Sequence, residues 1–92
     1  MSNTRDKVKY IEAKLEDLLE GPINKTPVDI SKGVERLYGV SRQTFLKAVR
    51  NLKSRGYPVY RTRVRHYSED ECNTWMSLMV ICPKGRRRKD VF

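Results

Sequence analysis

The segment VERLYGVSRQTFLKAVRNLKSRGY, residues 34–57, decides the fold that the sequence predicts. Apolar residues occur at helical spacing on both sides of Gly39, a residue type that adopts the positive φ of a tight turn at little cost. The spacing predicts one helix that begins at Pro27 and ends at Gly39, and another that Ser41 caps and Gly56 ends. Because the turn between them is very short, we expect the two helices to cross at a steep angle.

The flanking sequence supplies a helix before this segment and two strands after it. Residues 4–20 place apolar side chains at spacings of three and four, and the Gly-Pro pair that follows ends this helix. Residues 57–67 alternate between two faces, which predicts a strand with one solvated side, and residues 74–82 predict the returning strand. The expected fold is therefore α+β, with three helices followed by a two-stranded β-hairpin.

Basic residues are concentrated in the middle of the chain. Residues 40–67 contain eight Lys or Arg side chains and no acidic one, whereas residues 1–39 contain seven of each sign. The whole chain of 92 residues carries a formal net charge of +9. Charge of one sign over so short a segment favours a polyanionic partner. The longest apolar stretch, residues 75–82, is interrupted by Ser77 and is far shorter than the roughly 20 residues of a membrane-spanning helix, so we expect no membrane partner.

The order of elements and the stretch from Gly39 to Tyr57 resemble the winged helix-turn-helix DNA-binding regulators of bacteria and phages. The resemblance rests on the Gly-Val-Ser turn, the polar start of the following helix, and the pattern Leu-x-x-x-Gly-Tyr that leads into the wing. The chain departs from the family at Glu35, where Ala or Gly is usual. The resemblance implies sequence-specific binding of double-stranded DNA by a small transcriptional regulator or an accessory factor of a phage or mobile element, with residues 41–55 as the recognition helix in the major groove.

The side chains that remain after the core positions are subtracted suit this function. Arg pairs bidentately with guanine, Gln and Asn pair with adenine, and Lys or Thr can reach bases or phosphates. Alternating arginines on the first strand can grip the backbone beside the helix. We expect base contacts from Arg42, Gln43, Thr44, Lys47 and Asn51, and phosphate contacts from Ser41, Arg50, Lys53, Arg61, Arg63 and Arg65.

The last nine residues are charged and poor in apolar side chains. We therefore divide the chain into a folded DNA-binding domain, residues 1–83, and a basic flexible tail, residues 84–92. The tail loosely resembles an AT-hook but lacks the Pro and Arg that flank its central pair, which favours a nonspecific phosphate-binding arm. The basic residues of this arm are Lys84, Arg86, Arg87, Arg88 and Lys89.

Catalytic and metal chemistry have little support in the sequence. His66 is the lone histidine and falls in a predicted strand, where packing is its more common role. Neither Cys72 nor Cys82 has an evident activating partner, and a pair of cysteines makes neither a disulfide framework nor a zinc site. We expect no enzymatic activity, cofactor, metal or small-molecule ligand, and a cytoplasmic, nucleoid-associated protein of a bacterial or phage-infected cell.

Two other functions fit parts of the sequence. An RNA-binding module would use Tyr57, Tyr60 and Tyr67 as stacking platforms among the arginines. A protein-interaction domain that modulates a host factor would use the apolar strand 74–82 and the acidic hairpin tip, residues 69–71. The phosphates of DNA would repel the side chains of this tip, Glu69, Asp70 and Glu71. The apolar surplus of that strand predicts either a homodimer through the strand or through the first helix, or burial of the strand within one subunit.

Overall fold

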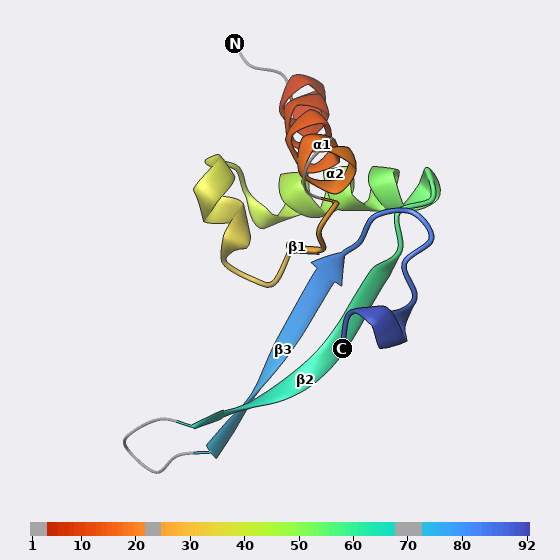
Figure 1. Cartoon of the computed structure of the whole chain (residues 1–92). Helices are drawn as coiled ribbons and strands as arrows, with labels where there is room; N and C mark the ends of the chain where they lie inside the picture. The colour runs from red at the N-terminus through yellow and green to blue at the C-terminus, as the bar shows by residue number, and fades with distance from the viewer. Residues whose placement is uncertain (1–3, 22–24, 68–72) are drawn as a thin grey trace.

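The computed structural model describes residues 4–21, 25–67 and 73–92 (Figure 1). The acidic hairpin tip and Cys72 lie outside these residues. The elements in chain order are the helix α1 (Thr4–Glu20), the strand β1 (Val28–Asp29), the 3-10 helix η1 (Val34–Tyr38), the helix α2 (Arg42–Ser54), the strands β2 (Val59–Tyr67) and β3 (Asn73–Ile81), and the 3-10 turn η2 (Arg88–Asp90).

The helices α1 and α2 cross at one end of the molecule, and the β2–β3 hairpin extends away from them (Figure 1). The core lies where α1, α2 and the base of the sheet meet. It contains the apolar stripe of α1, the inner face of α2 and Ile81 near the end of β3. The side chains with no solvent exposure include Ile11, Leu15, Leu19, Ile30, Phe45, Leu52 and Ile81. Burial of each such side chain stabilises the fold by roughly 1.5–3 kcal/mol relative to exposure.

The prediction of three helices followed by a two-stranded hairpin is wrong. The expected helix from Pro27 to Gly39 is replaced by β1, a turn, and the five-residue η1. Gly33 has a φ of 105°, which interrupts a right-handed helix, so only the residues after it form helical turns. Before it, the N–H of Ile30 donates to the carbonyl of Met79 at 2.8 Å, because the backbone here pairs with β3 rather than with its own next turn.

The observed fold is therefore α+β with two α-helices and a three-stranded antiparallel sheet in the order β1-β3-β2. The two long strands lie close to the predicted ranges and pair from Val59 with Ile81 to Tyr67 with Asn73. The short β1 adds to the other edge of β3, where Val28 is opposite Ile81 and Asp29 opposite Val80. The strand β3 therefore has a paired strand on both edges only at the base of the hairpin.

The C-terminal residues lie against the body of the protein. The hydroxyl of Tyr60 in β2 donates to the carbonyl of Arg86 at 2.6 Å, and the Arg86 guanidinium donates to the carbonyl of Lys25 at 3.1 Å. The segment that the sequence assigned to a flexible arm thus includes the turn η2 and two hydrogen bonds to other parts of the chain. In the described part of the protein, no helix is long and apolar enough to cross a membrane.

Candidate nucleic-acid interface

The helix α2 has one face in the core and the opposite face in solvent. Its buried side chains are Phe45, Ala48, Val49 and Leu52, which follow the predicted helical spacing. The opposite face forms a polar ridge, which we call the α2 ridge. It consists of the exposed side chains of Gln43, Lys47, Arg50, Asn51 and Lys53, all of them candidates from the sequence.

The first turn of α2 is fixed by a hydroxyl cap. Ser41 has extended backbone angles, and its Oγ accepts a hydrogen bond from the N–H of Thr44 at 3.3 Å. The same Oγ donates to Oγ1 of Thr44 at 3.0 Å, so each hydroxyl is engaged by the other. Thr44 is half-buried, whereas Ser41 is exposed at the helix N-terminus, where the helix dipole favours an anion.

Arg42 lies differently from the other candidates because its side chain is held by the protein itself. Its guanidinium donates to Oε2 of Glu35 at 3.1 Å and to the carbonyls of Ser31 at 3.0 Å and Ile30 at 2.9 Å. It also lies over the ring of Phe45, 5.8 Å from the ring centroid. This cluster joins the start of α2 to the loop between β1 and η1, and it occupies the group that we expected to contact a base.

The buried carboxylate of Glu35 is the anion of this cluster, with a relative exposure of 8%. Burial alone would raise its pKa. The backbone N–H bonds from Glu35 and Gly33 and the nearby Arg42 outweigh burial, so the pKa of Glu35 is lowered from its ordinary value of 4.5. The N–H of Gly33 donates to Oε2 of Glu35 at 2.8 Å. Glu35, the position at which the sequence departs from the helix-turn-helix pattern, therefore forms an ion pair with Arg42.

The strand β2 carries its three alternating arginines on one face. Arg61, Arg63 and Arg65 are all exposed, and they lie opposite Met79, Ser77 and Trp75 of β3 respectively. The guanidinium of Arg65 lies over the Trp75 ring at 5.0 Å from its centroid, and Nη2 of Arg61 is 3.5 Å from the sulfur of Met79. The neighbouring strand thus holds the guanidinium groups at both ends of the row against its own side chains.

The α2 ridge and the β2 arginines meet at the base of the hairpin. Leu46, Arg50 and Lys53 of α2 line one shallow hollow together with Val59, Arg61 and Met79 of the sheet. Within the part of the chain that the structure describes, no ion pair neutralises the cations of the ridge and the row. These cations are Lys47, Arg50, Lys53, Arg61, Arg63 and Arg65, and we call them, with Gln43 and Asn51, the α2–β2 surface.

The other arginine of the central segment is paired with α1. The guanidinium of Arg55 contacts the carboxylates of Glu12 and, at 3.3 Å, Glu16. Glu16 also accepts a hydrogen bond from the hydroxyl of Tyr57 at 3.3 Å. These contacts join the end of α2 to the middle of α1, which gives Arg55 a role within the fold.

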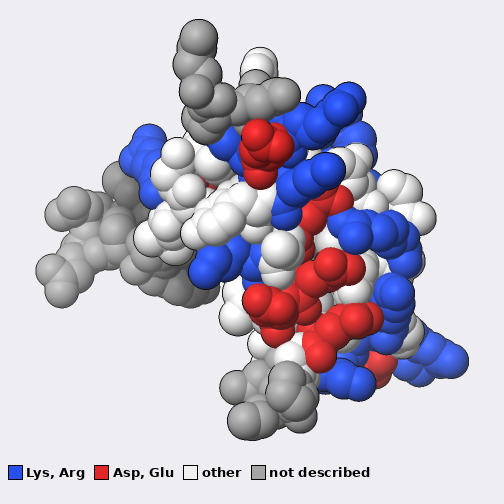
Figure 2. All heavy atoms as spheres, turned by 90° about the horizontal axis from the view of Figure 1, so that it is seen from above, with Lys and Arg blue, Asp and Glu red and all other residues white. Residues whose placement is uncertain are grey.

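Negative charge gathers on α1. Glu16, Asp17 and Glu20 surround a shallow hollow beside Gly21. Figure 2 shows acidic side chains across the middle of the face seen from above and basic ones along its edges. Among the residues that the structure describes, the hollow between α2 and β2 is lined by cations and no acidic residue, whereas Glu12 of α1 lines a separate hollow together with Lys47 and Asn51.

The structure bears on the aromatic residues considered for RNA stacking. Tyr57 has a relative exposure of 1%, and burial next to Glu20 and Glu16 raises its pKa. Its ring is covered by the Lys84 ammonium, 5.0 Å from the centroid. Tyr60 is half-buried and bonded to the backbone of Arg86. Tyr57 is therefore not available as a stacking platform.

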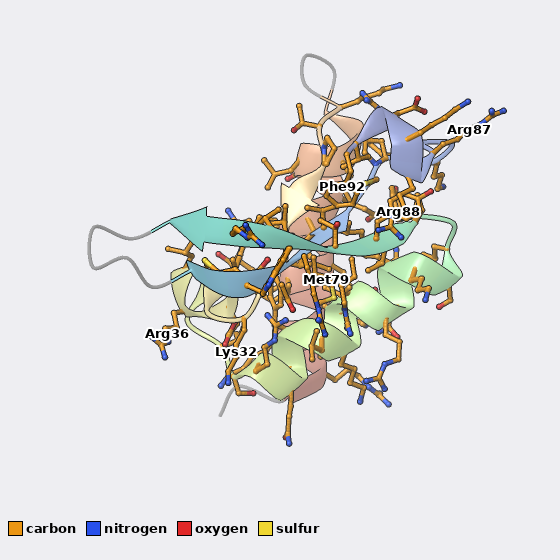
Figure 3. All side chains as sticks on the ribbon, turned by 90° about the horizontal axis from the view of Figure 1, so that it is seen from below. Lys32, Arg36, Met79, Arg87, Arg88 and Phe92 are labelled. Carbon is orange, nitrogen blue, oxygen red and sulfur yellow. The ribbon has the colours of Figure 1, made fainter. Side chains whose placement is uncertain are left out.

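The sequence did not single out an apolar hollow at the free edge of β3. Val34 and Leu37 of η1 line it together with Val64, Met76 and Leu78 of the hairpin. One sequence signal for this hollow was present, because both faces of residues 74–82 are apolar. The other was missed because the predicted helix from Pro27 to Gly39 placed Leu37 among its buried residues, whereas its relative exposure is 84%. Lys32 and Arg36 lie on the same side of the molecule (Figure 3). A homodimer through this strand or through α1 stays a prediction.

Groups that could bind a metal or act as a nucleophile are sparse in the described residues. No cluster of three His, Cys, Asp or Glu side chains suited to a metal occurs among them. Cys82 is buried, and burial raises the pKa of its thiol, which disfavours the reactive thiolate.

Comparison of the chain with models of known families, with curated proteins and with solved structures found no match. The likeness of residues 39–57 to helix-turn-helix regulators therefore rests on the residues quoted above.

Proposed function

We propose that the protein binds double-stranded DNA through the α2–β2 surface. The α2 ridge enters the major groove, and the arginines of β2 contact the phosphates beside it. The observation that carries the proposal is the shared hollow in which Arg50 and Lys53 of the helix meet Arg61 of the strand. One polyanion can neutralise both sets of cations there without any rearrangement of the fold.

Base readout is assigned to the exposed middle of the ridge. Gln43 and Asn51 carry amide groups that pair bidentately with adenine, and Lys47 between them donates to guanine or to a phosphate. Thr44 is half-buried and bonded to Ser41, and Arg42 is bonded to Glu35, so these two fix the start of the helix. The pattern favours a site that contains adenines.

Phosphate binding is assigned to Arg50, Lys53 and the arginines of β2. Each is exposed and, within the described residues, has no acidic partner. Alternating arginines on one strand repel one another unless an anion neutralises them. Guanidinium groups suit this role because they bind phosphate oxygens bidentately.

The biological role that fits is a small transcriptional regulator or an accessory factor of a phage or mobile element, acting on the nucleoid in the cytoplasm. The support is the resemblance of the Gly-Val-Ser turn and of the Leu-x-x-x-Gly-Tyr pattern to such regulators. RNA binding through stacked tyrosines is less well supported, since Tyr57 is buried.

Selection of bound duplexes from a random pool, followed by fluorescence anisotropy, tests the proposal. We expect an enriched motif, with tighter binding to that duplex than to a scrambled duplex or to single-stranded RNA. The variant Lys47→Ala is expected to weaken binding, whereas the matched variant Lys14→Ala on α1 is expected to bind as the unmodified protein does. Equal binding of the RNA and both duplexes, unaffected by Lys47→Ala, would contradict the proposal.

A further inference from the structure

A second cluster of cations lies on the side of the hairpin opposite α2. It belongs to the turn η2 and its approach, where residues 86–89 are consecutive basic side chains and all are exposed. In Figure 3, η2 with Arg87 lies on one side of the β2–β3 hairpin and α2 lies on the other. We call this cluster of Arg86, Arg87, Arg88 and Lys89 the tail surface.

The hydrogen bonds of the sheet support this placement. Tyr60 and Arg61 are neighbours in β2, so their side chains point to opposite faces of the sheet. The hydroxyl of Tyr60 donates to the carbonyl of Arg86, whereas Arg61 lines the hollow that it shares with α2. The tail surface and the α2–β2 surface are therefore separated by the thickness of the sheet.

Contacts with other residues hold the tail surface in a defined conformation. The guanidinium of Arg86 donates to the carbonyl of Lys25. The N–H of Arg87 donates to the carboxylate of Asp90 at 3.2 Å, and the guanidinium of Arg88 lies 5.8 Å from the centroid of the Phe92 ring. These contacts leave the charged ends of Arg87 and Lys89 exposed on one short turn.

A single straight duplex cannot contact both surfaces. Double-stranded DNA has a persistence length of about 50 nm, and bending a short site by 40–90° costs on the order of 1–6 kcal/mol. The protein measures 46 × 33 × 23 Å, so a duplex that lies on the α2–β2 surface would have to turn sharply to reach the opposite face. The tail surface is thus available to another polyanion.

We propose that the tail surface binds a second segment of duplex DNA, so that one protein molecule bridges two duplexes. This inference rests on the proposed function, because the first duplex is the one on α2 and β2. Contact at the tail surface is with phosphates, because its side chains are consecutive cations without the amide groups that read adenines on the α2 ridge.

A two-duplex capture assay tests the bridge. A biotinylated duplex is immobilised and loaded with protein, free protein is washed away, and a fluorescent second duplex is added. The test variant is Arg87→Gln with Lys89→Gln, and the control is Lys7→Gln with Lys14→Gln on α1, which removes the same charge. The affinity for the first duplex is measured separately by anisotropy, and circular dichroism verifies the fold of each variant.

We expect the unmodified protein and the control to capture the second duplex. Loss of two phosphate contacts lowers the affinity for the second duplex by about 30-fold at 0.15 M salt, by the counterion-release relation. The affinity of the tail variant for the first duplex is expected to match that of the control.

Three results would overturn the bridge. The unmodified protein could bind the first duplex and capture no second one. The tail variant could capture as much as the control, which would place the bridging contact elsewhere, for example between two protein copies. The tail variant could lose affinity for the first duplex, which would place the tail on that duplex. Failure of the unmodified protein to bind the first duplex is a separate outcome, and it would refute the proposed function together with the bridge.

Discussion

The row of arginines on β2 offers the sharpest test of how the protein binds DNA. The variant replaces Arg61, Arg63 and Arg65 with Gln, which keeps much of the side-chain length and removes the charge. All three side chains are exposed, so the substitution leaves the buried core intact. We expect weaker binding to every duplex, because these groups contact phosphates and read no bases.

The salt dependence gives the size of the effect. Arg50, Lys53 and the three β2 arginines amount to five phosphate contacts, so the logarithm of affinity should fall against the logarithm of salt concentration with a slope of about −4.5. Removal of three contacts should reduce the slope to about −1.8. Between 50 and 200 mM salt the affinity of the unmodified protein should therefore fall about 500-fold, and that of the variant about 12-fold.

The assay is fluorescence anisotropy over a salt series with one selected duplex and one scrambled duplex. The control is Gln43→Ala, which removes an uncharged group from the α2 ridge and should leave the slope unchanged. A triple variant with the slope of the unmodified protein would refute the assignment of β2 to the phosphates. A variant that alters sequence preference without altering general affinity would refute it too.

Further predictions concern the helix, the buried carboxylate and the core. Gln43→Ala and Asn51→Ala should each reduce discrimination between the preferred and a mismatched duplex by about 1–3 kcal/mol, measured by competition binding, and unchanged discrimination would remove that residue from base readout. The pKa of Glu35 is lowered by folding, so its ionised form stabilises the protein above the ordinary value of 4.5, and this stabilisation is lost as pH falls through the lower folded-state pKa. Urea denaturation between about pH 5 and pH 3 should therefore show a smaller loss of stability in Glu35→Gln than in the unmodified protein, and equal losses would contradict the ionised Glu35–Arg42 pair. Phe45→Ala, at a fully buried position, should lower the free energy of unfolding by about 3–5 kcal/mol, and a loss below about 1 kcal/mol would contradict the packing of α2 on α1.

Periodicity was sufficient to predict the elements that bury one regular face. The apolar spacing of α1 and α2, the cap at Ser41 and the alternation of β2 each follow from the sequence, because a single face decides the structure. The segment between Pro27 and Gly39 has no such face. Its five apolar residues, Val28, Ile30, Val34, Leu37 and Tyr38, are compatible with a helix as well as with a strand and a short helical turn. Pairing with the edge of β3, which is distant in the sequence, decides in favour of β1.

The same distinction applies to the candidate site. Exposure of Gln43, Lys47 and Asn51 follows from the position of the core stripe on α2, so a helical projection is sufficient to predict it. The engagement of Arg42 does not follow, because Glu35 reaches it only after η1 has folded against the start of α2. The position of the tail likewise depends on the hydrogen bond between Tyr60 and Arg86, which joins residues 26 positions apart.

Chemical-shift mapping of the isotope-labelled protein during titration with its selected duplex tests the central claim most directly. Binding through the α2–β2 surface predicts that the amides of Gln43, Lys47 and Asn51 shift together with those of Arg61 and Arg63, while the acidic side of α1 is unaffected. Shifts confined to α1, or to the apolar hollow between η1 and β3, would contradict the claim.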